Sequence, residues 1–234
     1  MASRVLIGLL VNVFFAALAF IARSVTLSGA LSGLLLGTWI YSFLGARGFF
    51  VVAAFFILGS LFTRLGFQAK EARGIAQRMG GRRTYREAFA NGLVGALFAT
   101  LVFFTGNFLY SIAFVASFAT ALADTTATEL GSLYGRRPFL FPSFKRVAPG
   151  TLGAVSLEGT LFGIAAAGFL TFFSFFLNLI QKQDILVVIL GSAIGFLAES
   201  LLAGLPFRVD HDVRNLLNTL FGATAAMMLG RIFY

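Results

Sequence analysis

Three carboxylates in the middle of the chain stand where apolar segments end or begin. Asp124 and Glu129 close one apolar segment, and Glu158 opens the next. The loop between them carries four basic side chains, those of Arg136, Arg137, Lys145 and Arg146. Mg²⁺ prefers oxygen ligands and usually joins one or two carboxylates to substrate phosphates. This arrangement therefore predicts metal-assisted chemistry on a phosphate group.

The first acidic motif could form one polar face of a helix. Residues four apart are neighbours on a helix, which pairs Asp124 with Thr128 and Thr125 with Glu129. An acid at a helix C-terminus opposes the helix dipole, so helix termination alone explains Asp124 poorly. We predict that Asp124 and Glu129 are catalytic and bind the metal.

The segment that leads to Glu158 could hold a phosphate. Glycines let backbone amides approach a phosphate, and a helix N-terminus attracts anions, although the P-loop pattern is absent. We predict a catalytic and metal-binding role for Glu158, with phosphate contacts from Lys145, Arg146, Gly150, Thr151, Gly153 and Ser156. The alternative is a flexible turn with Ser156 as a helix N-cap. For Gly159 and Gly163 we favour close helix packing.

A further polar group precedes the last apolar segment. Asp210 and Asp212 alternate there, and Asn215 and Asn218 recur on one helix face. We predict Asp210 and Asp212 as metal ligands, Asp212 also as catalytic, and both asparagines as nucleotide ligands. N-capping is the alternative for the two aspartates. His211, the single histidine, is expected to be solvated.

A basic stretch between residues 70 and 91 could close over a nucleotide. Its predicted contacts with phosphate or nucleotide come from Lys70, Arg82, Arg83 and Asn91. The alternative is contact with anionic headgroups of the membrane surface alone, which basic cytoplasmic segments commonly make.

Composition fixes the class of protein that must position these residues. The 234 residues are 59% hydrophobic and 12% charged, with a mean hydropathy of +0.91, whereas soluble domains carry roughly 25% charged residues. We therefore predict a single polytopic membrane domain over residues 1–234. The absence of cysteine excludes thiol catalysis. The net charge of +9 is explained by topology and lipid contact, so no nucleic-acid partner is expected.

A transmembrane helix needs about 20 mainly apolar residues. Segments of this kind predict an all-α protein with about eight spans, at 5–21, 25–44, 46–63, 89–105, 107–123, 159–179, 185–202 and 216–233. The long connections are then about 64–88, 124–158 and 203–215. Of the 18 basic residues, 14 fall in alternate connections, the last two being Arg208 and Arg214. The positive-inside rule then predicts both termini outside and the active site on the cytoplasmic face, in a bacterial inner or thylakoid membrane.

Two features of the spans remain to be explained. Glu199 lies inside the seventh span, where a carboxylate needs a partner or a role. Similar short strings recur at 30–37 and 156–163, and at 91–95 and 218–222. Their matching offsets suggest the hypothesis of two parallel four-helix halves.

Four motifs, taken together, resemble those of a known membrane family. They are the series Lys70…Gly80-Gly81-Arg82-Arg83…Asn91-Gly92, the string ADTxATELG at 123–131, the string GTxGxVSLEGT at 150–160, and DxDxxNxxN at 210–218. The pattern is similar to that of the membrane family that contains the phytyl-phosphate kinase of tocopherol and phylloquinone synthesis. The resemblance runs from about residue 65 to the C-terminus.

This resemblance implies a membrane lipid-phosphate kinase. It would transfer a phosphoryl group from CTP or another nucleoside triphosphate, with Mg²⁺, onto a prenyl or phytyl monophosphate. A CTP-dependent cytidylyltransferase or a polyprenol kinase would need the same residue types and remains an alternative. A transporter of lipids or small solutes is a further alternative, although transporters usually keep ionisable groups near the bilayer midplane. The sequence does not indicate an oligomeric state.

Overall fold

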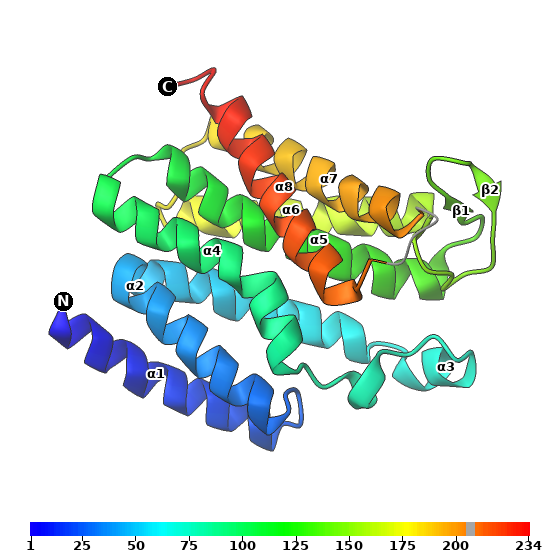
Figure 1. Ribbon diagram of the computed structural model, residues 1–234, viewed down its shortest axis with the longest axis horizontal. Coiled ribbons are helices and arrows are strands. Elements are labelled where there is room, and N and C mark those ends of the chain that lie inside the picture. Colours follow the sequence, from blue (N-terminus) through cyan, green and yellow to red (C-terminus); the bar gives the residue numbers. More distant parts are fainter. Residues whose placement is uncertain (205–208) are drawn as a thin grey trace.

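The computed structural model describes residues 1–204 and 209–234, and most of them are helical. The elements in chain order are α1 (Ala2–Ile21), α2 (Leu27–Arg64), α3 (Phe67–Ala72), the 3₁₀ turn η1 (Arg78–Gly81), α4 (Tyr85–Thr105), α5 (Leu109–Tyr134), β1 (Phe139–Leu140), β2 (Lys145–Arg146), β3 (Ala154–Val155), α6 (Leu157–Phe176), α7 (Asp184–Ala203) and α8 (His211–Gly230). Figure 1 shows the long helices side by side in one bundle. The prediction of an all-α membrane protein is confirmed.

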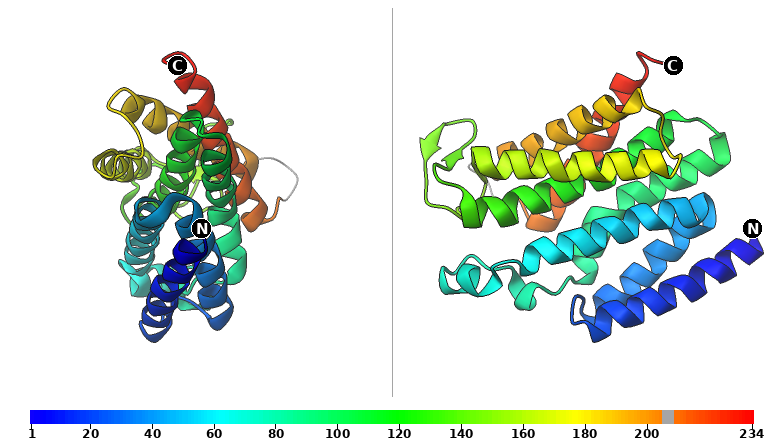
Figure 2. Two further views of the ribbon diagram at one scale, coloured as in Figure 1. Left: turned by 90° about the vertical axis from the view of Figure 1, so that its left-hand side faces the viewer. Right: turned by 180° about the vertical axis from the view of Figure 1, so that it is seen from behind.

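The segment α2 forms two spans rather than one. It has 38 residues, about twice what a membrane crossing needs, and its helical geometry breaks at Gly45, where φ is 65°. Glycine adopts a positive φ readily because it has no Cβ atom. The two legs fold back on each other in Figures 1 and 2. Two spans were predicted here, meeting at residue 45.

Six of the described helices are long and apolar enough to cross a membrane, namely α1, α2, α4, α5, α6 and α7. The last helix, α8, is as long as α6 and α7 but carries Asp212, Arg214, Asn215 and Asn218 in its first half. Its polar half must therefore be covered by other helices, since unsatisfied polar groups are expensive in lipid.

The helix α5 lies at the centre of the bundle. It packs against α2, α4, α6, α7 and α8, and every residue from 111 to 123 is buried. A helix that is apolar all round belongs in such a core. Close packing with α6 depends on small residues, because a Cβ on Gly163 would come within 2.8 Å of the Ala123 carbonyl. The packing role expected of Gly163 is confirmed.

The connections that carry most polar residues gather at one end of the bundle, named here the loop end. It comprises α3, the strands β1–β3 and the first turn of α8, and it lies opposite the chain termini in Figures 1 and 2. The strands form a small antiparallel sheet in the order β2-β1-β3. Arg208, counted among the basic residues of the last connection, lies outside the described residues. That the loop end faces the cytoplasm stays a prediction.

The helices that a repeat would pair are packed very differently. Under the hypothesis of two parallel halves, α1 would correspond to α5. However, α1 packs along α2 at the edge of the bundle and exposes apolar side chains such as Leu6, Leu10 and Phe14. The helix α5 occupies the centre. The repeat stays a hypothesis, and any ancestral symmetry is not kept in the packing.

Candidate active site

The central helix turns its two acidic residues toward different neighbours. The helix α5 continues to Tyr134, so Asp124 and Glu129 lie within it and not at its end, as the sequence suggested. Five residues correspond to about 140° of rotation around an α-helix. Asp124 therefore faces α7 and α8, whereas Glu129 faces the end of α2 and α3. The single polar face expected from these motifs is divided in two.

Glu129 is held by a buried lysine. The Nζ atom of Lys70 donates to Glu129 Oε2 at 2.5 Å and to the carbonyl oxygens of Phe62 and Thr63 at 3.2 and 2.7 Å. Those carbonyls belong to the last turn of α2, where backbone acceptors lack helical partners. A cation there also interacts favourably with the negative end of the helix dipole. Lys70 is 0% exposed. It was predicted to reach a substrate phosphate, but its three donors are used within the protein.

A second buried cation completes this group. The Arg83 guanidinium lies 5.1 Å from the centroid of the Phe55 ring, in space left free by the missing side chain of Gly59. Burial lowers the pKa of Arg83 from its usual value, and the charges of Glu87 and Glu129 oppose that change. Gln77 Nε2 donates to Glu87. We call these residues the α3 cluster: Lys70, Gln77, Arg83, Glu87 and Glu129.

On the other face of α5, a second polar group lies between three helices. Arg214 Nη1 of α8 donates to Glu199 Oε1 of α7 at 2.7 Å. The charges of both residues act on the Asp124 carboxyl, and the Asn218 amide lies against it. We call these residues the α8 cluster: Asp124, Glu199, Arg214, Asn215 and Asn218.

Close packing one helical turn deeper explains why the α8 cluster forms. Side chains at Gly195 or Gly222 would collide with Thr120, so α5, α7 and α8 meet there on small residues. Asp124 and Glu199 each lie four residues beyond this contact, and Asn218 four residues before Gly222 on the antiparallel α8. Four residues are about one turn, so all three lie in the layer nearest the loop end.

The α8 cluster contains buried polar atoms that lack partners. Within the described part of the chain, Asn215 Oδ1, both side-chain polar atoms of Asn218 and Arg214 Nε make no hydrogen bond. Asn215 is 6% exposed and Asn218 0% exposed. Buried polar groups in proteins are nearly always paired, and exceptions often mark an unseen water or ion.

The first turn of α4 connects the α3 cluster with the first turn of α8. Glu87 belongs to the α3 cluster, whereas Arg86 Nε lies 3.6 Å from Asp212 Oδ2 in the first turn of α8. Asn91 follows one turn later, is buried, and donates to the Glu87 carbonyl at 2.9 Å. The predicted residues Asn91, Asp124, Glu129, Asn215 and Asn218 are thus brought to one region around α5.

Other predicted residues lie apart from this region. Lys145 and Arg146 are exposed on β2, and Arg82 is exposed beside η1. Thr151 bonds the Ala148 carbonyl. Gly150 and Gly153 have positive φ in the same loop. Ser156 caps α6 by accepting from Gly159 N, as the N-cap alternative proposed.

The predicted metal ligands are not gathered at one place. Asp210 caps α8 by accepting from Asp212 N at 2.9 Å, which is the N-cap alternative. Glu158 accepts from Arg136 N, Glu129 is held by Lys70, and Asp212 lies between Arg86 and His211. In residues 1–204 and 209–234, no three acidic, histidine or cysteine side chains lie together as a metal site.

Glu199 and Arg214 are members of the site that sequence reasoning did not assign. Glu199 was noted only as an unexplained charge inside a span, and Arg214 only as a topology signal. A signal was present: an acid near one end of an apolar span needs a partner, and few basic residues occur at matching depth.

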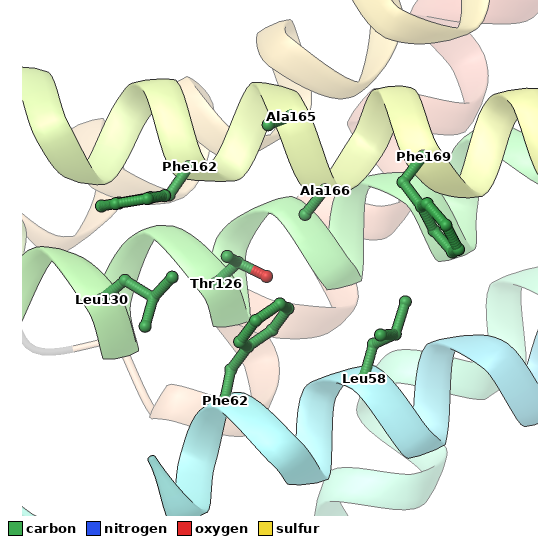
Figure 3. A pocket seen from close by; sticks show the side chains of 8 residues that line it. All are labelled: Leu58, Phe62, Thr126, Leu130, Phe162, Ala165, Ala166 and Phe169. Atoms are coloured by element: carbon green, nitrogen blue, oxygen red, sulfur yellow. The ribbon is translucent and has the colours of Figure 1, made fainter. Parts of the chain in front are cut away.

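An apolar cleft lies beside the α3 cluster, between α2, α5 and α6. It measures about 340 Å³, at the lower end of the ~300–1,000 Å³ of ligand pockets. Figure 3 shows its lining side chains, which are Leu58, Phe62, Thr126, Leu130, Phe162, Ala165, Ala166 and Phe169. Leu130 directly follows Glu129 on α5, and the Phe62 carbonyl is bound by Lys70. The cleft therefore ends near buried charge.

Comparison with known proteins gives a consistent picture. The family model described as integral membrane protein DUF92 matches residues 10–208. Protein VTE6, chloroplastic, of Arabidopsis thaliana is 36% identical over 214 residues, which is 86% of this chain and 64% of the relative. The chain thus spans less than two thirds of that relative's length.

Two further relatives match over most of their own length. An uncharacterized membrane protein of Synechocystis is 37% identical, covering 94% of this chain and 89% of the relative. One of Methanocaldococcus jannaschii is 30% identical, covering 97% and 94%. No solved structure matches the chain. The resemblance stated from the four motifs is confirmed.

Proposed function

The chain belongs to the DUF92 family of integral membrane proteins, and on that premise we propose that it phosphorylates a prenyl-type lipid monophosphate. The donor would be a nucleoside triphosphate, CTP in the first place, and the product a lipid diphosphate such as phytyl diphosphate. One observation carries this proposal. Acids and cations from five segments meet around the loop end of α5, as phosphoryl transfer at a membrane surface requires.

The reaction asks little covalent chemistry of the protein. An oxygen of the acceptor phosphate attacks the γ-phosphorus, the bond to the β–γ bridging oxygen breaks, and the nucleoside diphosphate leaves. Catalysis of such a step is mainly positioning and charge neutralisation. The acceptor is already an anionic phosphate monoester, so no strong general base is needed.

The α8 cluster and the exposed basic residues of β2 are suited to different parts of this task. Arg214 Nε and the Asn215 and Asn218 side chains are available in the α8 cluster, where a donor phosphate would find unused polar atoms. Mg²⁺, when bound, would neutralise donor phosphate charge, and the cluster offers it two carboxylates and two amide oxygens. Exposed Lys145 and Arg146 on β2 are placed to attract the nucleotide from solution.

The apolar cleft on the α3-cluster side of α5 offers a place for the lipid chain. Its lining is almost entirely hydrocarbon, and it lies within the membrane-spanning parts of α2, α5 and α6. A chain lying there would bring its headgroup toward the loop end near Arg73, whose Nη1 donates to the Ser132 carbonyl. Arg73 is exposed and so can also contact a phosphate.

The proposal is tested with purified full-length protein in detergent, phytyl monophosphate, Mg²⁺ and CTP labelled either at the γ- or at the α-phosphate. Transfer of γ-label to a lipid diphosphate, with release of CDP, is the expected result. Transfer of α-label with release of pyrophosphate would instead identify a cytidylyltransferase. If phytol is supplied in a parallel assay and it, and not phytyl monophosphate, accepts the γ-label, the protein is a polyprenol-type kinase.

A matched pair of variants links any activity to the site. Asp124→Asn should lose activity, whereas Glu71→Gln should keep it, because Glu71 is an exposed carboxylate of α3 outside both clusters. If monodisperse wild-type protein labels no lipid from any common nucleoside triphosphate, the kinase proposal is wrong. Equal activity of the two variants would remove Asp124 from the mechanism.

A further inference from the structure

The α8 cluster holds two partly buried carboxylates but one basic side chain. Asp124 and Glu199 are two carboxylates, and Arg214 is the one cation that acts on both. The Arg214 side chain is 3% exposed and is committed to Glu199 at 2.7 Å. No ion pair joins Asp124 to any basic residue within the described ranges. Asp124 and Glu199 are only partly buried, but a carboxylate withdrawn from most of the solvent without an ion-pair partner is still unfavourable, and a cation beside Asp124 would relieve this.

The amide side chains around Asp124 point to the same conclusion independently. Asn218 is fully buried and near enough to Asp124 to act on its carboxyl, but neither its oxygen nor its nitrogen meets hydrogen-bond distance and angle with any described residue. Asn215 Oδ1, one turn away on the same face of α8, is likewise buried and unpaired within that part of the chain. A buried polar atom left without a partner carries the desolvation penalty of its group. Several together, beside an unpaired carboxylate, indicate a missing ligand.

We propose that the α8 cluster binds one divalent cation of the Mg²⁺ class between Asp124, Glu199, Asn215 and Asn218. All four side chains offer the carboxylate or amide oxygens that hard cations select. The site needs only two carboxylates, because Mg²⁺ usually keeps open positions for water and substrate phosphates. A phosphate oxygen on the cation would also give Arg214 Nε the acceptor that it lacks.

This assignment replaces the acidic set read from the sequence. It retains Asp124 and adds Glu199, while Glu129, Glu158, Asp210 and Asp212 have other partners in the fold. The catalytic role of the cation rests on the proposed function. Its binding does not, because it is argued from the charge of the cluster and the unpaired amide groups alone.

The test measures Mn²⁺ binding to the full-length protein in detergent, without nucleotide or lipid. Free Mn²⁺ is followed by electron paramagnetic resonance, and Mg²⁺ is then added as competitor. One saturable site per chain is expected, displaced by Mg²⁺ and not by an excess of Na⁺. Loss of an outer-shell partner of a metal weakens binding about 10–100-fold. Removal of a direct ligand in Asp124→Asn or Glu199→Gln is therefore expected to weaken it on the order of 100-fold.

Two further variants keep the result decisive. Asn218→Leu removes the amide but preserves volume and should weaken Mn²⁺ binding at least about tenfold. Asp212→Asn is the matched control, since it changes a carboxylate on the same helix outside the proposed site, and should leave binding unchanged. The proposal is overturned if wild type has no saturable site, or if Asp212→Asn loses binding while Asp124→Asn keeps it.

Because no substrate is present, this experiment separates the two proposals. Mn²⁺ binding without lipid phosphorylation would leave the cation site standing and reject the kinase. If the protein phosphorylates lipid but Asp124→Asn leaves Mn²⁺ binding unchanged, the kinase proposal stands and the cation site is rejected. Variants are compared only after size-exclusion chromatography shows the same single peak as wild type.

Discussion

The two polar clusters on opposite faces of α5 solve the problem of buried charge in different ways. In the α3 cluster, Lys70 neutralises Glu129 and donates its other two hydrogen bonds to carbonyl groups in the last turn of α2. In the α8 cluster, Arg214 pairs with Glu199. Asp124 forms no ion pair in the described residues, and the Asn215 and Asn218 side chains there have polar atoms without hydrogen-bond partners. The charges of the α3 cluster are paired within the protein, whereas we propose that the α8 cluster needs a bound cation.

The difference separates residues that hold the fold from residues that bind a ligand. Both clusters contain family motif residues, both are buried and both lie at the loop end, so neither motif membership nor burial tells them apart. The decisive quantity is how many polar atoms remain without partners once the chain has folded. By that measure we assign Lys70 and Glu129 to the fold, and we propose a binding role for Asn218 and for Asp124 beside it.

The largest expected effect comes from breaking the complete cluster. Lys70→Met would leave Glu129 buried without its cation and the end of α2 without its cap. Removing one partner of a buried ion pair typically destabilises a protein by about 3–5 kcal/mol. We expect a loss of this size in reversible unfolding followed by far-ultraviolet circular dichroism in mixed micelles.

A double variant is the control for Lys70→Met. Lys70→Met combined with Glu129→Leu removes both charges and should recover a large part of the lost stability, because apolar replacement of a whole buried pair is often neutral. If Lys70→Met alone lowers stability by less than about 1 kcal/mol, the α3 cluster does not hold the fold and the contrast between the clusters fails.

Sequence reasoning found the spans more readily than the site. Hydropathy placed the bend at Gly45 and the long connections, because span length and glycine conformation are local properties. It ended the fifth span at residue 123, whereas α5 runs to Tyr134. The threonines and acids of the ADTxATELG motif looked like a membrane exit, but the helix continues through them, and neighbouring helices bury Thr126 and Glu129.

The division of the acidic motif between two faces could be anticipated only in part. Helical geometry alone gives the angle between Asp124 and Glu129. Which helix meets each of them depends on packing at Gly195 and Gly222, which is a matter of tertiary contact. The pairing of Glu199 with Arg214 likewise joins two separate helices, α7 and α8, so no local pattern contains it.

A smaller effect is expected from pushing the α8 cluster apart. A Cβ at residue 222 would collide with the Thr120 side chain where α5 and α8 meet. Overpacking of this kind costs about 1–3 kcal/mol, so Gly222→Ala should lower stability by that amount and weaken Mn²⁺ binding as well.

Gly168→Ala is the matched control for this steric test. Gly168 also lies in a membrane helix, but a Cβ there would meet only Ile189 Cδ1, at 3.9 Å. Because alanine favours helix over glycine by about 1 kcal/mol, this variant should keep or slightly raise stability and leave Mn²⁺ binding unchanged. Equal behaviour of both variants would show that the α5–α8 contact does not position the site.

The smallest change in stability, and the sharpest comparison, is expected from Asp124→Asn. The variant removes one charge from a polar cluster, as Lys70→Met does, but Asp124 is only partly buried, has no ion-pair partner in the described residues and is opposed by Glu199. Without divalent cation we therefore expect stability equal to wild type or higher by up to about 1 kcal/mol, instead of a loss. Added Mn²⁺ should then stabilise wild type, by about 2.7 kcal/mol at 100 times the dissociation constant, and leave Asp124→Asn unaffected. A clear destabilisation of the variant in the absence of metal would mean that Asp124, like Lys70, serves the fold, and the two clusters would then differ in degree and not in purpose.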